Sequence, residues 1–435
     1  MRGSRIGIGV IGLGTVGGEV VRVLRRNRAL VRERCGVGVE VRRAVDLDRK
    51  RLRAIGLPPK CLGSDFHAVL ADPDVQIVVE LIGGIGVARE VVLGALRAGK
   101  HVVTANKALL ATHWQEIFSL AQERRCAVGF EASVMAGVPV IRSIEEGLAG
   151  NVIPSLLGIL NGTSNFVLTR MAGRGMEFSR ALNEARRKGL CEANASLDID
   201  GHDAAQKLSI LGSLALGKWL PPAEVHREGI GGIEREHLAE AQEQFGYVLR
   251  PLAIFKHSGA GVEARVHPTF VPGAHPLASV EDEFNAILIT AETAGSVLLV
   301  GKGAGAKPAA SGVISDVIGL ARAIHQGGHE GMLVPLRPTK ERVRVAPIEM
   351  VESKFYLRFS VIDRPGVLSY ITGVLGKNQV SIATCDQRGR SERGTVPVII
   401  ITHRAREGAV RKALAETDSA TRIVKRATVA IRIEE

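Results

Sequence analysis

The chain has 435 residues, of which 46% are hydrophobic and 23% are charged, and its mean hydropathy is +0.13. These values exclude an intrinsically disordered protein and a membrane protein with many spans. Since a domain usually takes roughly 100 to 200 residues, the length predicts about three domains. The net charge of +12 and the pI near 9.8 keep an acidic partner such as nucleic acid open.

The distribution of charge and the cysteines bear on partners and compartment. Residues 354–435 hold 15 Lys and Arg against eight Asp and Glu, so the basic excess lies largely near the C-terminal end. The five cysteines form no C-x-x-C pair and are odd in number, which favours reduced thiols in the cytoplasm over a disulfide framework. No apolar stretch reaches the roughly 20 residues of a membrane-spanning helix, so we expect no membrane association.

The first third of the chain predicts an α/β fold with a parallel sheet. An apolar run at residues 6–11 is followed by Gly12-Leu13-Gly14-Thr15-Val16-Gly17 and a helical stretch over residues 18–26. Further strands are predicted at 39–46, 76–82, 101–104 and 126–130, and helices at 65–71, 87–99 and 113–124. This alternation predicts a Rossmann-like, doubly wound sheet over residues 1–130.

The rest of the chain predicts two further domains. Residues 131–326 mix strand runs with amphipathic helices and are expected to form an α+β catalytic and dimerisation domain, whose last helix, about 311–326, returns to the first domain. Three prolines mark residues 327–353 as a linker. Residues 354–435 predict the order βαββαβ, with Pro365 in the first turn of the first helix.

The glycine motif predicts dinucleotide binding, with a bare tight turn as the alternative. Gly12, Gly14 and Gly17 follow an apolar strand and open a helix, where a pyrophosphate can approach backbone N–H groups. Asp46 stands where the second strand should end and can accept the ribose 2′-hydroxyl, which favours NAD. The Arg-Lys-Arg run at 49–51 leaves two readings open: a 2′-phosphate partner, and hence NADP, or an exposed helix start.

Two lysines are candidates for reaction chemistry. Lys107 follows the strand run 101–103 and should project at the carboxyl edge of the sheet, where ligands bind in such folds, although a solvated loop lysine is the alternative. Asp203 and Lys207 are four residues apart, hence on one helical stripe that continues into apolar positions. An ordinary salt bridge would explain this pair, but a partly desolvated lysine beside a carboxylate also suits proton transfer at neutral pH.

Taken together, these residues resemble the homoserine dehydrogenases that carry a C-terminal ACT domain. The resemblance covers most of the chain, in order. Its motifs are G-L-G-T-V-G at 12–17, E-L-I-G-G at 80–84, T-A-N-K at 104–107, E-A-S-V-M-A-G-V-P at 131–139, G-I-L-N-G-T-S-N at 158–165, D-x-D-G-x-D-A-A-x-K at 198–207, G-x-G-A-G at 301–305 and D-R-P-G-V-L at 363–368. The resemblance implies NAD(P)-linked, reversible reduction of L-aspartate 4-semialdehyde to L-homoserine, which leads to threonine, methionine and isoleucine.

The resemblance also implies roles for individual residues. Lys207 takes the position of the catalytic lysine, with Asp203 beside it. The implied substrate contacts are Glu192, Asp203, Gly162, Thr163 and Gly189. The implied nucleotide contacts are Gly12, Leu13, Gly14, Thr15, Val16, Gly17, Asp46, Lys107 and Gly303. A monovalent cation, sodium or potassium, is implied at the Glu131 side chain and the carbonyls of Val134, Ala136 and Val138, an all-oxygen set suited to a hard ion.

Two stretches depart from the family's usual pattern. In place of Tyr-Ala-Glu-Ala-Asp-Pro the chain has Leu-Cys-Glu-Ala-Asn-Ala at 190–195, without the aromatic wall and the turn proline, which bears on substrate affinity. In place of Gly-Pro-Gly-Ala-Gly, residues 301–305 include Lys302, a charge close to the expected nicotinamide. Lys302 therefore bears on cofactor preference.

The resemblance of residues 354–435 to an ACT domain implies regulation. Such modules commonly bind a free amino acid where two of them pair, and Gly366 would let a ligand approach the backbone. Because homoserine leads toward threonine, we expect threonine feedback through a homo-oligomer. A domain used only for assembly is the alternative.

The sequence is also compatible with two other functional classes. A dehydrogenase of the phosphoglycerate type also carries an ACT tail, but its glycine motif follows a long N-terminal segment, whereas here the motif begins at residue 12. A non-enzyme alternative is an amino-acid-sensing, nucleotide-binding regulator, or a nucleic-acid binder that exploits the charge of +12. With three Tyr, two Trp and no recognition motif with interleaved aromatics, we expect no nucleic-acid partner.

Overall fold

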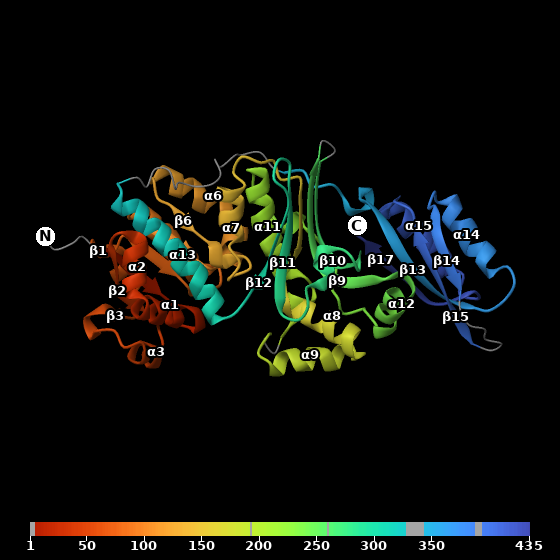
Figure 1. Cartoon of the computed structure of the whole chain (residues 1–435), viewed down its shortest axis with the longest axis horizontal. Helices are drawn as coiled ribbons and strands as arrows, with labels where there is room; N and C mark the ends of the chain where they lie inside the picture. The colour runs from red at the N-terminus through yellow and green to blue at the C-terminus, as the bar shows by residue number, and fades with distance from the viewer. Residues whose placement is uncertain (1–4, 192–193, 259–260, 328–342, 388–393) are drawn as a thin grey trace.

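The computed structural model describes residues 5–191, 194–258, 261–327, 343–387 and 394–435. Three parts follow one another along the longest axis of the molecule (Figure 1). The N-terminal part contains a six-stranded sheet, and the middle and C-terminal parts share a second sheet. Most of the predicted linker at 327–353 lies outside the described residues, and Val345 within its described end bridges to Val262.

The N-terminal sheet is parallel, with the strand order β3-β2-β1-β4-β5-β6, which confirms the Rossmann-like prediction. Its central strands are apolar and buried on both faces, as Ile8 paired with Ile77 illustrates. The order reverses beside β1, so a crevice for ligands is expected at the carboxyl ends of β1 and β4. The elements are β1 (Arg5–Ile11), α1 (Thr15–Arg26), α2 (Arg28–Cys35), β2 (Gly38–Val45), α3 (Arg49–Ala54), β3 (Leu62–Gly63), α4 (His67–Ala71), β4 (Ile77–Glu80), α5 (Gly86–Arg97), β5 (His101–Thr104), α6 (Lys107–Glu123) and β6 (Val128–Gly129).

Two helices of the N-terminal part begin three or more residues earlier than the sequence pattern predicts, and α13 (Ala306–His325) likewise begins before the predicted residue 311. α1 starts at Thr15, inside the glycine motif, and α6 starts at Lys107 instead of at residue 113. Asn106 explains the second difference, because its side chain accepts a hydrogen bond from the Leu109 N–H at 3.1 Å and caps the helix. A kink at His113 divides α6, so its apolar periodicity marked only the second half.

The middle part is built on the strand order β12-β11-β7-β9-β10, and α8, α11 and α12 pack against β9. Neighbouring strands of this set are antiparallel. The elements are α7 (Val140–Arg142), β7 (Ser155–Ile159), α8 (Gly162–Arg174), α9 (Phe178–Arg187), α10 (Ser196–Ile199), α11 (His202–Leu216), α12 (Arg235–Phe245), β9 (Tyr247–Ser258), β10 (Gly261–Pro272), β11 (Phe284–Ala291) and β12 (Gly295–Lys302).

Helix α13 (Ala306–His325) leads from the middle part back to the N-terminal part. It packs against α1 and α2 and lies across the N-terminal part in Figure 1. The Asp316 carboxylate on α13 accepts a hydrogen bond from the Glu131 N–H at 2.9 Å. This hydrogen bond therefore joins the two segments through which the chain passes between the N-terminal and middle parts.

Apart from the two-residue strand β16 (Ala405–Arg406), the C-terminal part has the predicted βαββαβ order, with the sheet order β17-β13-β15-β14. Its elements are β13 (Glu352–Ile362), α14 (Val367–Lys377), β14 (Ile382–Gln387), β15 (Thr395–Thr402), α15 (Glu407–Ser419) and β17 (Val424–Ile433). The placement of Pro365 in the first helical turn is wrong. Gly366 is the N-cap of α14 at φ +89°, a left-handed conformation that suits glycine, and Pro365 precedes it.

One sheet runs through the middle and C-terminal parts. The last strand, β17, pairs in parallel with β10, with Thr269 opposite Arg432 and Phe270 opposite Ile433. The Glu434 N–H extends this pairing by donating to the Phe270 carbonyl at 2.9 Å. Figure 1 shows β10, β17 and β13 side by side at this junction.

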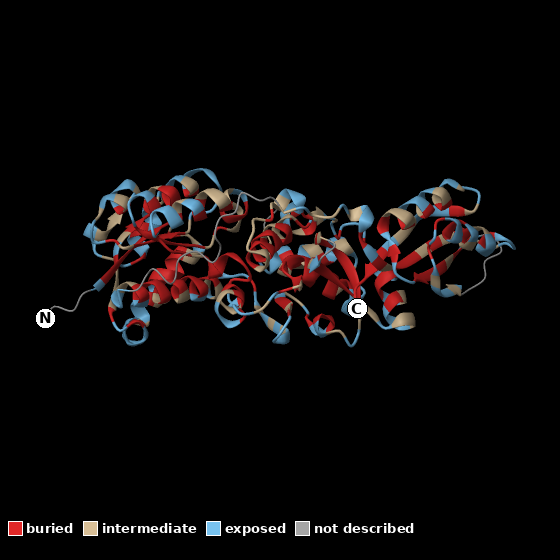
Figure 2. Cartoon of the chain, turned by 90° about the horizontal axis from the view of Figure 1, so that it is seen from above, coloured by how far each residue is buried: buried red, intermediate tan, exposed pale blue. Residues whose placement is uncertain are grey.

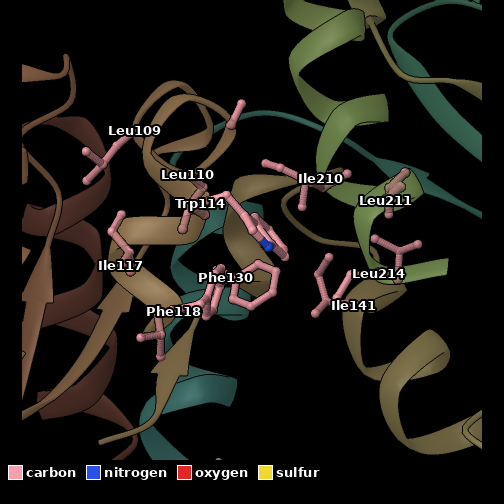
Figure 3. Close-up of a cluster of buried hydrophobic side chains, with 14 of the residues drawn as sticks. Leu109, Leu110, Trp114, Ile117, Phe118, Phe130, Ile141, Ile210, Leu211 and Leu214 are labelled. Atoms are coloured by element: carbon pink, nitrogen blue, oxygen red, sulfur yellow. The ribbon is translucent and has the colours of Figure 1, made fainter. Parts of the chain in front are cut away.

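A buried apolar cluster joins the N-terminal and middle parts. Trp114 of α6 reaches toward Ile210, Leu211 and Leu214 of α11 (Figure 3), and all four side chains are buried. Buried residues occur in all three parts (Figure 2). The contact between α6 and α11 places the start of α6 next to the start of α11, where the candidate site lies.

Candidate active site

The glycine turn after β1 has the backbone geometry of a pyrophosphate site. Gly12 has φ +93°, and a Cβ on Gly17 would lie 1.9 Å from the Gly12 carbonyl oxygen, so both positions require glycine. A Cβ on Gly14 would meet only the Arg51 guanidinium, at 3.7 Å, so this backbone is open to a ligand. Leu13, Thr15 and Val16 complete a turn at a helix N-terminus, which favours anions.

Asp46 lies at the end of β2, where the sequence places it, and is held by the turns around it. Its carboxylate accepts hydrogen bonds from the Leu13 N–H at 2.6 Å and the Asp48 N–H at 2.8 Å. Arg51, half-exposed on α3, lies 3.7 Å from the same carboxylate and also pairs with Asp48. The crevice therefore presents a carboxylate and a guanidinium side by side.

Lys107 is positioned by a polar network at the carboxyl ends of β4 and β5. The buried Glu80 carboxylate accepts hydrogen bonds from the Thr104 hydroxyl at 2.6 Å and from the Ile82 N–H at 2.8 Å. Asn106 donates to the Gly84 carbonyl at 2.7 Å while it caps α6. Lys107 is therefore the first residue of a fixed helix, not a loop lysine, and its side chain is 36% exposed.

The structure brings Lys107 and Lys207 to one carboxylate. Lys207 Nζ lies 2.8 Å from one oxygen of Asp203 and donates to the Leu160 carbonyl at 2.7 Å. Lys107 Nζ lies 3.2 Å from the other oxygen of Asp203. The pair predicted on one helical stripe thus extends across the interface between the N-terminal and middle parts. Asp203 therefore takes part in more than a salt bridge within α11, because it also pairs with a lysine of α6.

Two further side chains of this cluster were not predicted as site residues. Asn161 Nδ2 donates to both Asp198 and Asp203, at 2.7 and 2.8 Å. Burial raises the pKa of the Asp198 carboxyl, and the nearby Asp203 charge adds to this shift. Burial also acts to raise the pKa of Asp203, but the ammonium groups of Lys207 and Lys107 outweigh it and hold that pKa at about 2. Asp203 is therefore ionised at neutral pH.

The expected substrate contacts lie around this cluster, except Glu192, which is outside the described residues. Gly162 begins α8, and the Thr163 hydroxyl donates to the Leu190 carbonyl at 3.0 Å, which brings the 189–191 segment to α8. Gly189 has φ +70° at the end of α9. Glycine is thus required there for the backbone turn.

Gly303 packs against a side chain: a Cβ there would lie 2.2 Å from Asn285 Cγ, so glycine is required for packing. The neighbouring Lys302 lies 3.5 Å from Glu283, at 58% exposure. Its charge is thus partly balanced by the protein itself.

The residues implied for a cation lie in the crossing from the N-terminal to the middle part. Glu131 is buried, and its carboxylate accepts the N–H groups of Ile141 and Arg142 at 2.9 and 3.0 Å. Met135 and Ala136 have φ of +54° and +29°, a left-handed conformation that is uncommon for residues with side chains. In the part of the chain that the structure describes, no group of three His, Cys, Asp or Glu side chains is arranged to hold a metal.

Carbonyl ligands would complete the implied cation set. Within the described residues, the Val140 N–H donates to the Val138 carbonyl, whereas no donor reaches the carbonyls of Val134 or Ala136. Both residues are buried. The turn is thus compatible with carbonyl ligation, and the fit rests on backbone oxygens.

The described helices include none long and apolar enough to cross a bilayer. The profile of the homoserine dehydrogenase NAD-binding domain matches residues 12–131, the profile described as homoserine dehydrogenase matches 139–318, and that of the ACT domain matches 355–418.

Individual relatives agree with these profiles. A homoserine dehydrogenase of Neisseria gonorrhoeae is 38% identical over 431 residues, covering 99% of this chain and 98% of its own length. The crystal structure of a homoserine dehydrogenase from Thiobacillus denitrificans has a TM-score of 0.92 at 38% identity, covering 99% of this chain and 98% of that one. A hyperthermophilic archaeal homoserine dehydrogenase in complex with NADPH has a TM-score of 0.61 at 28% identity, covering 72% and 97%. The chain belongs to the homoserine dehydrogenase family of NAD(P)-dependent oxidoreductases.

Proposed function

We propose that Lys207 and Asp203 carry the homoserine dehydrogenase reaction at the interface between the N-terminal and middle parts. The observation that carries this proposal is the contact of Lys107 and Lys207 with the two oxygens of Asp203, at 3.2 and 2.8 Å. When bound, the nicotinamide supplies the hydride for reduction of the semialdehyde. Lys207 Nζ gives a proton to the carbonyl oxygen and takes one from the hydroxyl in the reverse direction. Asp203 holds Lys207 in place.

The nucleotide is proposed to lie against the glycine turn, with its pyrophosphate on the N-terminus of α1. Gly14 leaves the backbone open to this approach, which supports the assignment. Asp46 would accept the ribose 2′-hydroxyl of NAD, whereas Arg51 would pair with the 2′-phosphate of NADP. The proposed contacts are Gly12, Leu13, Gly14, Thr15, Val16, Gly17, Asp46, Lys107 and Gly303.

The substrate is proposed to lie beside the start of α11. Its ammonium group would bind the carboxylates of Glu192 and Asp203, since a cationic group is matched by anionic side chains. Gly162, Thr163 and Gly189 would line the same position. The hydrogen bond from Thr163 to Leu190 supports a common place for α8 and the 189–191 segment.

A monovalent cation is proposed at the 131–138 crossing. The two left-handed residues Met135 and Ala136 support it, because such strained backbone persists where the surroundings fix it. The ligands would be the Glu131 carboxylate and the carbonyls of Val134, Ala136 and Val138. A cation there would order the crossing and counter the buried Glu131 charge.

Threonine feedback through paired ACT domains of a homo-oligomer is proposed as the regulation. Gly366, at φ +89° on the strand-to-helix turn, supports an effector approaching the backbone. The edge strand β12 exposes Leu298 and Val300, at 40% and 49%, which supports contact with a second copy. Regulation would require threonine to bind one state of the oligomer more tightly than the other.

The domain boundaries and the compartment are also proposals. We place domains at 1–130, at 131–326 with its returning helix, and at 354–435, joined by a linker at 327–353. The three matched profiles support these limits. All five cysteines are free thiols, which supports a reducing cytoplasm.

The full chain provides the test. NAD(P)H absorbance should change with homoserine plus NAD or NADP, and with aspartate semialdehyde plus the reduced nucleotides. Replacing sodium and potassium by a bulky organic cation should lower this activity if a monovalent ion is bound. No turnover in either direction would overturn the proposed site.

The regulatory proposal has its own readout. Millimolar threonine should inhibit the full chain, and Gly366→Ala should relieve that inhibition while turnover continues, because Ala strains a left-handed position. Indifference to threonine, isoleucine, methionine and lysine alike would leave only an assembly role for the ACT domain.

A further inference from the structure

Asn161 lies between two carboxylates of the proposed active site. It is the N-cap of α8, is 4% exposed, and follows directly after Leu160, whose carbonyl holds Lys207. Its Nδ2 donates to Asp198 Oδ1 at 2.7 Å and to Asp203 Oδ2 at 2.8 Å. One amide group therefore uses both of its N–H bonds on two acidic side chains.

The orientation of this amide is fixed by the helix that it caps. Asn161 Oδ1 accepts a hydrogen bond from the Ser164 N–H at 2.8 Å. The opposite orientation would set Oδ1 against two carboxylates and turn the NH₂ group toward a backbone donor. The oxygen of the Asn161 side chain therefore caps α8, and its nitrogen bridges the two carboxylates.

The bridge lies within a defined set of charged and titratable groups. Asp198 comes from α10, Asp203 and Lys207 from α11, Lys107 from α6, and Cys191 from the segment before α10. Asp203 is neutralised by two ammonium groups, at 2.8 and 3.2 Å. Asp198 accepts from Asn161 but has no such direct ion pair among the described residues. Asn161 is thus the group that separates Asp198 from the Asp203 charge.

We propose that Asn161 is a positioning residue that holds Asp198 and Asp203 ionised side by side, so that Asp203 keeps Lys207 facing the substrate. This rests on the proposed role of Lys207. A neutral NH₂ group stabilises both anions, because it donates to each without adding a titrating charge. Without it, each carboxylate would be exposed to the repulsion of the other, and the pKa of both would rise.

The substitution Asn161→Ser separates the bridge from the cap. Serine caps helices about as well as asparagine but cannot donate to both carboxylates. We expect Tm to change little and the acid limb of kcat/KM against pH to move upward by about one unit. On the acid limb the variant should lose up to about tenfold in kcat/KM at a given pH, and it should recover activity at higher pH, with nucleotide binding unchanged.

Asn161→Asp is the second variant. It keeps the size and the cap but adds a third carboxylate to the cluster, so its acid limb should move further upward than that of Asn161→Ser. If serine were to destabilise the fold, this near-isosteric variant would still report the charge effect.

Asn165→Ser is the matched control. Asn165 lies on the same helix and is fully buried, but its Nδ2 donates only to backbone carbonyls, including those of Val280 and Asp282. This variant should lower Tm and leave the acid limb where it is. Acid limbs of Asn161→Ser and Asn161→Asp that coincide with that of the unmodified chain would overturn the bridge, whereas full activity of Lys207→Ala would overturn the site itself.

Discussion

The middle part is joined to its two neighbours in different ways. On the N-terminal side, side chains make the connection: Lys107 pairs with Asp203, and Trp114 packs toward α11. On the C-terminal side, the backbone pairing of β10 with β17 adds to side-chain contacts such as that of Arg432 with Glu228. Side-chain contacts can separate and re-form at modest cost, but a buried backbone ladder cannot open without leaving polar groups unpaired. The first junction therefore suits a cleft that admits and releases ligands, and the second suits a rigid attachment.

The two junctions also differ in the balance between their acidic and basic side chains. At the C-terminal junction Arg432 lies between Glu228 and Glu407, at 2.7 and 2.6 Å. Although burial acts to raise the pKa of Glu228, its hydrogen bonds with Arg432 and His226 hold that pKa far below its usual range. Arg411 pairs with the same two carboxylates, so two guanidinium groups face two carboxylates at this junction.

At the N-terminal junction carboxylates outnumber bases. Glu131, Glu145 and Asp316 surround Arg142 in a small cavity of about 60 Å³. Burial, and secondarily the neighbouring carboxylates, raise the pKa of Glu145 to about 8 and that of Asp316 to about 7. Burial therefore favours the protonated carboxyls at the N-terminal junction, whereas the pairing with Arg432 favours the ionised Glu228 at the C-terminal junction.

Breaking the catalytic contact should give the largest effect. Lys207→Ala should lower kcat by about 10² to 10⁴-fold, because a general acid and base is lost, while nucleotide binding stays nearly intact. Lys107→Ala should weaken both substrate and nucleotide binding. Steady-state kinetics and nucleotide titration measure these outcomes. Lys377→Ala, an exposed lysine of the ACT domain, is the control and should keep full turnover. A Lys207→Ala chain that retained a tenth of the turnover would contradict the assignment.

Breaking the C-terminal junction should come next in size. Arg432→Met leaves the buried Glu407 and the partly exposed Glu228 without their main partner, and we expect it to cost about 3 kcal/mol of unfolding free energy in urea. Arg411→Met is the control, since Arg411 pairs with the same two residues but is 47% exposed, and should cost at most about 1 kcal/mol. Equal losses for the two variants would show that burial of the ion pair does not determine rigidity here.

The acidic junction should respond to pH in the opposite direction from a stabilising ion pair. A carboxyl whose pKa is raised by folding favours the folded state at low pH, and this advantage is lost as pH rises from about 4.5 to about 8. Glu145→Gln should therefore flatten the fall in stability between pH 5 and 9 and gain about 2 kcal/mol at the upper end. Urea unfolding at several pH values measures this. The control is Glu146→Gln, because the neighbouring Glu146 side chain is 66% exposed, and it should leave the decrease in unfolding free energy with pH unchanged. If the free energy of unfolding of Glu145→Gln fell with pH in parallel with that of the unmodified chain, Glu145 would not be the group responsible.

The smallest expected effect concerns the choice of nucleotide. Arg51→Ala should lower kcat/KM for NADP relative to NAD, and Asp46→Ala should shift the ratio toward NADP, each by about tenfold or less. The ratio of the two kcat/KM values is the measurement. Arg53→Ala, an exposed residue of the same helix, serves as control. A ratio that neither Arg51→Ala nor Asp46→Ala moved would place the 2′ position elsewhere.

Local signals predicted much of this molecule. The glycine motif and the alternation of apolar runs predicted the parallel sheet, and the four-residue spacing predicted the pair of Asp203 with Lys207. The start of α6 was missed because its signal is a single cap, Asn106, ahead of a kink. Contacts between distant segments carry no local signal. The ion pair of Lys107 with Asp203 and the bridge of Asn161 follow from how separate elements pack, and spacing along the chain does not reveal them.

The pairing of β10 with β17 also bears on how the chain folds during synthesis. β10 ends at Pro272, but its parallel partner includes Arg432 and Ile433, which follow much later in the sequence. Until those residues leave the ribosome, this edge of the middle sheet lacks its native neighbour, and an open edge invites pairing with other chains. We therefore expect β17 to protect the middle part from aggregation, and a chain that stopped before Arg432 would leave this edge of the middle sheet exposed.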